Sequence, residues 1–158
     1  IKKNGSEGYV YGMELDGSYQ INERLNAFGA IAFNDGMADT FPDSTLSSVR
    51  EPVSRLLPLT GILGLRCDLS DSQWIELSTI ISDKQDKLNT RDRRDAQRIP
   101  PGGTPSYTIF NLRYGLQLTE QFLLTAAIEN ITDQDYRIHG SGQNEPGINF
   151  IFGASINF

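Results

Sequence analysis

His139 is the only histidine of this sequence, and it is the first side chain to consider for catalysis or metal binding. Imidazole is a common metal ligand and acid or base. His139 lies in a stretch rich in glycine and serine, a few residues after Tyr136 and Arg137. We expect this stretch to be an exposed loop, where a lone histidine is rarely a ligand. We therefore predict no metal site and no cofactor.

A hydrolase triad is the other chemistry that this region could support. Asp135, His139 and Ser141 have suitable side chains, but a triad is defined by geometry and not by closeness in sequence. No serine of the nucleophile-elbow type is present. Cys67 is the only cysteine, which rules out an intrachain disulfide and a CxxC motif. We predict that the chain is not an enzyme.

The charge balance and hydropathy narrow the class of protein further. The 158 residues carry a formal net charge of −6, whereas a nucleic-acid binder needs a basic face. No apolar run approaches the ~20 residues of a membrane helix. A mean hydropathy of −0.36 does not exclude membrane-spanning strands, because alternating strands average out as polar.

The side chains alternate between apolar and polar with a period of two, which is typical of half-buried β-strands. The clearest case is 106–118, where Phe110, Leu112 and Tyr114 share a face opposite Asn111 and Arg113. A helix would scatter these residues around its circumference. About seven strands are predicted in this way, at 9–21, 25–34, 59–69, 74–81, 106–118, 122–129 and 148–158.

The connections between these strands alternate in length. Tight polar turns are predicted at 22–24, 70–72 and 119–121, and long loops at 35–57, 83–105 and 132–147. This alternation is expected of an up-and-down barrel with short turns at one rim and long loops at the other. Loops of this length are uncommon in compact soluble domains. If the last strand ends at the periplasmic rim, the long loops face the cell exterior.

The composition of the two faces favours a membrane barrel. Charged residues such as Glu14, Arg66 and Arg113 lie on the polar side of their strands, and aromatic residues lie near strand ends, as in interfacial girdles. Trp74 is predicted to be such an interface anchor. The charged run at 83–95 is interpreted as a solvated loop tip. We predict an all-β, antiparallel, up-and-down transmembrane β-barrel wall.

Two segments resemble TonB-dependent outer-membrane receptors. The first is Arg98-Ile-Pro-Pro-Gly-Gly-Thr-Pro-Ser-Tyr107 followed by Asn111-Leu-Arg113, and the second runs from Glu129-Asn-Ile-Thr-Asp through Tyr136 to Glu145-Pro-Gly147. The final Asn157-Phe158 resembles the aromatic C-terminal signal of such barrels. One departure is Ile148, which stands where the family usually has arginine.

The resemblance implies that 1–158 is the C-terminal part of a receptor β-barrel, with the plug domain and earlier strands absent from this chain. It implies energy-coupled uptake of a scarce nutrient, such as an iron complex with a siderophore or haem, at the outer membrane of a Gram-negative bacterium. The implied partners are lipid and lipopolysaccharide, the small ligand, and the plug domain and TonB through the missing N-terminal part. No nucleic acid is implied. The ligand-binding candidates in the outer loops are Arg98, Tyr136, Arg137, His139 and Asn144.

Two alternatives stay open at this point. A passive or adhesive outer-membrane barrel would have the same strand pattern without energy coupling. A soluble β-sandwich binding module would have the apolar faces buried against a second sheet, because periodicity alone does not say what covers a face.

Overall fold

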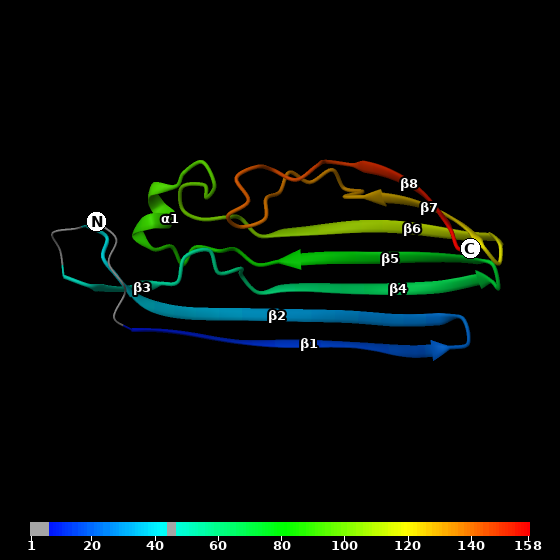
Figure 1. Cartoon of the computed structure of the whole chain (residues 1–158), viewed down its shortest axis with the longest axis horizontal. Coiled ribbons are helices and arrows are strands. Elements are labelled where there is room, and N and C mark those ends of the chain that lie inside the picture. Colours follow the sequence, from blue (N-terminus) through cyan, green and yellow to red (C-terminus); the bar gives the residue numbers. More distant parts are fainter. Residues whose placement is uncertain (1–6, 44–46) are drawn as a thin grey trace.

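The computed structural model describes residues 7–43 and 47–158, and within these ranges the chain folds as one antiparallel β-sheet (Figure 1). One short helix, α1 (Thr90–Arg94), is the only α-helix of the described ranges. The strands are β1 (Gly8–Asn22), β2 (Leu25–Thr40), β3 (Val49–Pro52), β4 (Thr60–Ser70), β5 (Gln73–Ser82), β6 (Tyr107–Thr119), β7 (Phe122–Glu129) and β8 (Asn149–Ile156). The predicted all-β class is confirmed.

The long strands lie side by side in the order of the sequence, β1-β2-β4-β5-β6-β7-β8, and each pairs antiparallel with the next. All the short turns lie at one end of the sheet and all the long connections at the other (Figure 1). The up-and-down order and the alternation of short and long connections are therefore confirmed. We refer below to the turn end and the loop end of the sheet.

In each short turn, the side chain of the last residue of the preceding strand accepts a hydrogen bond from the backbone of the turn. Oδ1 of Asn22, Oγ of Ser70 and Oγ1 of Thr119 each accept a hydrogen bond from the backbone N–H two residues further on, at 2.9, 3.3 and 3.3 Å. Asn, Ser and Thr favour turns because their short polar side chains can bond to the nearby backbone. The polar residues at these positions thus set where each strand stops.

The second connection differs from the prediction. We predicted a strand at 25–34 and a loop at 35–57, but β2 continues to Thr40 and then pairs with β3. The extension contains Asp35, Gly36 and Asp39, which are poor strand formers, and it is held by backbone partners on both sides, β1 and β3. The described ranges therefore contain eight strands and not about seven.

One face of the sheet carries the apolar row of every long strand, and we call it the apolar face. In β4, Leu63 and Leu65 are 58% and 46% exposed on this face, while Arg66 lies on the other. Within 7–43 and 47–158, no second sheet or long helix covers these side chains. The described chain is thus a single layer, which is not the arrangement of a β-sandwich.

The opposite face, which we call the polar face, carries charges in register. Arg66 pairs across the strands with Glu76, and Glu76 with Arg113. The Arg113 guanidinium lies 3.5 Å from Oε1 of Glu129 on β7. Opposite charges directly across a sheet stabilise the pairing, so this row supports the register of β4 to β7.

Trp74 lies on the polar face beside charged side chains, and its predicted role as an interface anchor stays a prediction. The Arg66 guanidinium carbon lies 4.1 Å from the centre of the indole ring, a cation–π contact. A Cβ at Gly115 would come within 2.2 Å of the ring, so the indole lies over this glycine on the neighbouring strand. The glycine makes room for an aromatic side chain among polar ones.

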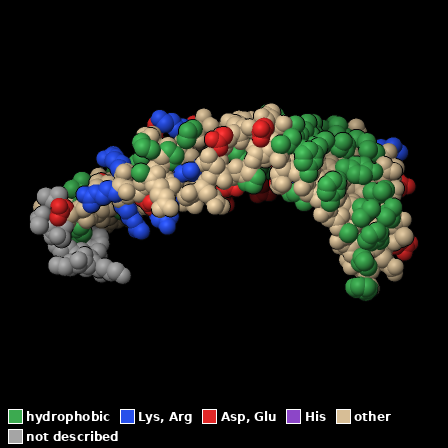
Figure 2. Space-filling model, turned by 90° about the horizontal axis from the view of Figure 1, so that it is seen from above, with side chains coloured by type: hydrophobic (Ala, Val, Ile, Leu, Met, Phe, Trp, Pro, Cys, Tyr) green, Lys and Arg blue, Asp and Glu red, His purple; other side chains and the backbone are tan. Residues whose placement is uncertain are grey.

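The buried side chains are concentrated at the loop end. Among the described residues, the buried hydrophobic side chains are Leu88, Ile99 and Ile109, and several buried polar ones belong to the same loops. Seen from above, the molecule is arched, with Lys and Arg gathered toward the loop end and hydrophobic side chains toward the turn end (Figure 2). Most of the buried polar side chains of the described residues therefore lie at the loop end.

No helix within 7–43 and 47–158 has both the length and the apolar character needed to cross a membrane.

Candidate functional site

Three long connections pack together at the loop end, and α1 joins two of them. Asn89 caps the helix, because its Oδ1 accepts from the backbone N–H of Asp92 at 2.8 Å. Its Nδ2 donates to the Pro52 carbonyl at 3.2 Å. Glu51 of β3 accepts from the backbone N–H of Thr90 at 3.0 Å and from its hydroxyl. The helix is thus tied to the β2–β4 connection at both its cap and its first residue.

Glu51 is held in its charged form by these bonds. Burial alone would raise the pKa of its carboxyl, but the hydrogen bonds from Thr40 and Thr90 outweigh burial and lower the pKa. The hydroxyl of Thr40 donates to Oε2, and Thr90 donates to Oε1. With both oxygens engaged, Glu51 supports the loops rather than offering a free carboxylate.

An ion-pair network links the same two connections. Oδ2 of Asp95 lies 2.8 Å from the Arg55 guanidinium and 3.1 Å from that of Arg98. The hydrogen bond from Arg98, with a smaller contribution from Arg55, lowers the pKa of Asp95. Arg98, a predicted ligand residue, is therefore paired with a carboxylate. It also packs beside Gly142 of the β7–β8 connection, where a Cβ would lie 3.2 Å from its Cγ.

His139 is buried, which corrects the expectation of an exposed loop histidine. Only 7% of it is exposed, and its Nδ1 lies 2.9 Å from the hydroxyl of Thr104 in the β5–β6 connection. Burial lowers the pKa of His139, the Arg55 charge adds to this, and the Asp92 charge opposes it. Asp92 is itself buried, and its Oδ2 has no hydrogen-bond partner among the described residues. His139 joins two loops as a neutral side chain.

Tyr136, Arg137 and Asn144 lie together in the β7–β8 connection. Nε of Arg137 donates to Oδ1 of Asn144 at 2.8 Å, and its NH1 group donates to the Gln97 carbonyl at 3.2 Å. The Tyr136 ring packs on that of Tyr107, with centroids 4.7 Å apart. Burial raises the pKa of Tyr136. The five predicted residues therefore lie in the β5–β6 and β7–β8 connections, and each contacts a residue of these connections or, for Tyr136, the first residue of β6.

Asn130 organises this connection, although the sequence pattern alone gave it no role. Its side chain is fully buried, with Oδ1 accepting from the backbone N–H of Gln134 at 2.9 Å and Nδ2 donating to the Gln134 carbonyl at 2.8 Å. Nδ2 also reaches the Pro146 carbonyl at 3.2 Å. Asn130 adopts a φ of 51°, which asparagine tolerates better than most residues. An asparagine directly after a strand, with Asp133 three residues on, was the available signal.

The turn that follows β7 also positions the start of the last strand, β8. Oδ1 of Asp133 accepts from the backbone N–H of Ile148 at 2.9 Å. A Cβ at Gly147 would come within 2.3 Å of that oxygen, so a larger residue there would displace the Asp133 carboxylate from this bond. Ile148, the departure from the resemblance, thus contributes its backbone to the turn, while its side chain is 46% exposed.

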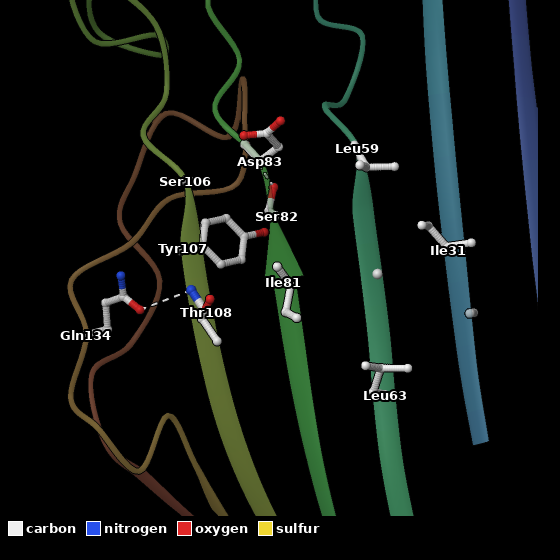
Figure 3. Close-up of a pocket in the computed structure, with 12 residues that line it drawn as sticks. Ile31, Leu59, Leu63, Ile81, Ser82, Asp83, Ser106, Tyr107, Thr108 and Gln134 are labelled. Atoms are coloured by element: carbon white, nitrogen blue, oxygen red, sulfur yellow. Dashed lines mark hydrogen bonds between the residues drawn. The ribbon is translucent and has the colours of Figure 1, made fainter. Parts of the chain in front are cut away.

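A groove lies on the apolar face close to the loop end, as Figure 3 shows. It has a volume of about 630 Å³ and is open along one side. Leu59, Leu63, Ile31 and Ile81 form its apolar walls. Gln134 lies at its polar end, where Oε1 accepts from the backbone N–H of Thr108 at 3.2 Å. No local sequence pattern predicts this groove, because four strands contribute to it.

Comparison with known proteins identifies the fold. No protein-family model matches the sequence, and no curated protein matches it. A solved structure, the copper transporter OprC, is similar with a TM-score of 0.77 and 19% sequence identity. The similarity covers 96% of this chain and 24% of that one. The chain therefore has the fold of about a quarter of that transporter.

The copper named for that transporter does not by itself place a metal site in this chain. Among the described residues, no three side chains of the His, Cys, Asp or Glu type come together as a ligand group. His139 is bonded to Thr104, and Cys67 belongs to the apolar row of β4. At 19% sequence identity, the similarity shows a shared fold alone.

Proposed function

We propose that this chain forms part of the wall and outer loops of a transporter β-barrel in the outer membrane of a Gram-negative bacterium. The observation that carries the proposal is the apolar face, which is exposed along the long strands and uncovered by any described part of the chain. Strands can span a bilayer only when every backbone group is paired, so a closed barrel is required. Among the described strands, β1 pairs only with β2 and β8 only with β7. Further strands would complete the barrel.

The finer proposal is a TonB-dependent receptor in which residues 1–158 form the C-terminal part of the barrel. The plug domain and the earlier strands would belong to the rest of the protein, and TonB would act through that part. The support is the resemblance of 98–113 and 129–147 to such receptors, together with the fold shared with a transporter. The substrate would be a scarce nutrient such as an iron complex, and the loops holding Arg98, Arg137 and His139 would face it. Lipid and lipopolysaccharide would surround the barrel.

Uptake experiments test this proposal. Cells with and without the intact gene are compared for growth and for uptake of labelled iron complexes, copper or cobalamin, with and without a protonophore. We expect uptake of one of these ligands to require both the gene and the proton gradient. Gene-dependent uptake that continues undiminished in the protonophore would instead favour a passive barrel. Recovery of the protein in a fraction other than the outer membrane would overturn both versions.

A further inference from the structure

The arginines of α1 differ from the other cationic side chains nearby, which have partners in the chain. Arg55 and Arg98 form ion pairs with Asp95, and Arg137 donates to Asn144. The exposed arginines of α1, in contrast, form no ion pair with any residue that the structure describes; they are Arg91, Arg93 and Arg94. No carboxylate of the described ranges therefore neutralises this helix by direct contact.

Two of these arginines line a pocket between α1 and the β2–β3 hairpin, at the loop end of the sheet (Figure 1). Arg91 and Arg94 are three residues apart, so their side chains share one face of the helix. Both line the pocket, whereas Arg93 does not. The NH1 group of Arg94 donates to the Pro42 carbonyl at 3.1 Å, which ties this guanidinium to the hairpin. The pocket has a volume of about 400 Å³, which is in the range of small-molecule sites.

Apart from its charged groups, the pocket offers mainly apolar surface. Ala38, Phe41, Pro42, Pro52 and Val53 line it. The polar side chains that also line it each make a hydrogen bond within the chain already; they are Thr40, Ser54, Asn89 and Thr90. A ligand in this pocket would therefore meet apolar groups on one side and guanidinium groups on the other.

Glu51 also lines the pocket, and its negative charge has to be counted. The hydrogen bonds from Thr40 and Thr90 engage both of its oxygens and hold it in the charged form. It offsets one of the two positive charges of Arg91 and Arg94. The lining residues thus keep a net positive charge, which attracts an anion to the pocket.

The pocket lies on the side of the polar face. Ala38 and Thr40 belong to the same row of β2 as Asn26, because alternate residues of a strand share a face. Asn26 pairs with Arg66, which lies on the polar face. In the proposed barrel the polar face would line the interior, so the pocket would lie at the outer mouth of that interior.

We propose that this pocket binds a small organic anion that carries a carboxylate on an apolar body, with the carboxylate at Arg91 and Arg94. Its place at the entrance of a transporter rests on the proposed function, whereas the binding chemistry does not. A guanidinium can donate two parallel hydrogen bonds to a carboxylate, and the apolar body would cover Phe41 and Val53. A bare inorganic anion would leave the apolar surface uncovered, and a neutral molecule would leave the arginines without an anionic partner.

Binding of an aromatic carboxylate to matched arginine variants tests the proposal. The probe is naphthoate, and its neutral analogue naphthamide has nearly the same shape. Isothermal titration calorimetry measures the affinity of the intact protein in detergent micelles for each, with protein-free micelles as the blank. Arg91→Gln removes one charge from the pocket, and Arg93→Gln removes one charge from the same helix outside it. Urea unfolding of the three proteins checks that they are folded.

We expect Arg91→Gln to weaken naphthoate binding about five-fold, as for the loss of a partly exposed ion pair. The Arg93→Gln variant should bind naphthoate almost as the wild-type protein does, and naphthamide should bind more weakly than naphthoate and be insensitive to Arg91→Gln. The proposal is overturned if the wild-type protein binds no naphthoate beyond the blank, or if naphthamide binds equally well. Equal losses in Arg91→Gln and Arg93→Gln would also overturn it, as would displacement of naphthoate by an equal concentration of inorganic phosphate.

The location of the intact protein in the cell separates this inference from the proposed function. A protein recovered in the outer membrane that shows no Arg91-dependent binding would remove the anion site and leave the barrel proposal standing. Arg91-dependent binding by a protein recovered in another fraction would keep the site and remove its place at a transporter entrance.

Discussion

Two neighbouring alanines in β7 offer a direct test of which face of the sheet meets lipid. Ala126 and Ala127 are adjacent and lie near the middle of the strand, on opposite faces. Ala126 lies across from Tyr114 on the apolar face, and Ala127 lies across from Arg113 on the polar face. Replacing either one with lysine adds the same charge at nearly the same depth. The two variants therefore differ only in the surroundings of the new ammonium group.

The expected effects differ by several kcal/mol. A lysine on the lipid face near the bilayer midplane destabilises a barrel by about 2 to 4 kcal/mol. At Ala127 the new ammonium group would lie next to Arg113 and Glu129, whose charges oppose each other. Cross-strand charge effects of this kind amount to about 1 kcal/mol or less. We therefore expect the free energy of unfolding to fall by about 2 to 4 kcal/mol in Ala126→Lys and to change little in Ala127→Lys.

Urea unfolding of the intact protein in lipid vesicles measures the free energy of unfolding of both variants. The folded fraction is followed by its altered migration in unheated gels. Equal losses in the two variants would refute the assignment of faces. A larger loss in Ala127→Lys would mean that the polar face is the one in contact with lipid. The same titration in detergent micelles should give the same order, because the apolar face is covered by hydrocarbon in both.

Three further predictions concern the loops and the indole. Asn130→Ala should destabilise the β7–β8 connection by about 2 to 4 kcal/mol, because buried hydrogen bonds are lost and alanine disfavours a positive φ. Limited proteolysis should then cut this connection, whereas Ile131→Ala, at an exposed position, should not make it sensitive to the protease. Burial lowers the pKa of His139, so the unfolded chain takes up a proton at a higher pH than the folded chain does. The stability of the loops should therefore hold above pH ~6.5 and fall as the pH drops below it. A His139→Gln variant whose hydrogen exchange kept the same pH dependence would contradict this. Gly115→Ala should displace the Trp74 ring, shift the indole fluorescence and cost about 1 to 3 kcal/mol, whereas Gly17→Ala, with open space at its Cβ, should leave the fluorescence unchanged.

The strands were predictable because their signal is local. In 106–118 each side chain falls on the face that its parity predicts, and β6 begins and ends within one residue of that range. The turns were predictable for the same reason, since Asn22, Ser70 and Thr119 bond to a backbone group only two residues away. Such contacts need no knowledge of the rest of the chain.

The site was predicted less well, because its contacts join residues far apart in the sequence. His139 was expected to be exposed from its glycine-rich and serine-rich surroundings, but it is buried against Thr104, which is 35 residues away. Trp74 was expected at an interface from its side-chain type alone, and the glycine that makes room for it belongs to the neighbouring strand, β6. No local pattern contains either partner.

The sequence by itself determined that the chain forms antiparallel strands with one apolar and one polar side, joined alternately by short turns and long loops. The period-two pattern and the turn residues act over a few residues, so they are present in any stretch of the chain. Only the tertiary structure decided that the described strands form a single layer with no other described segment over the apolar side, that the loops close over His139, and that a groove opens between four strands. These features depend on register and on long-range packing, which place side chains from distant segments next to one another.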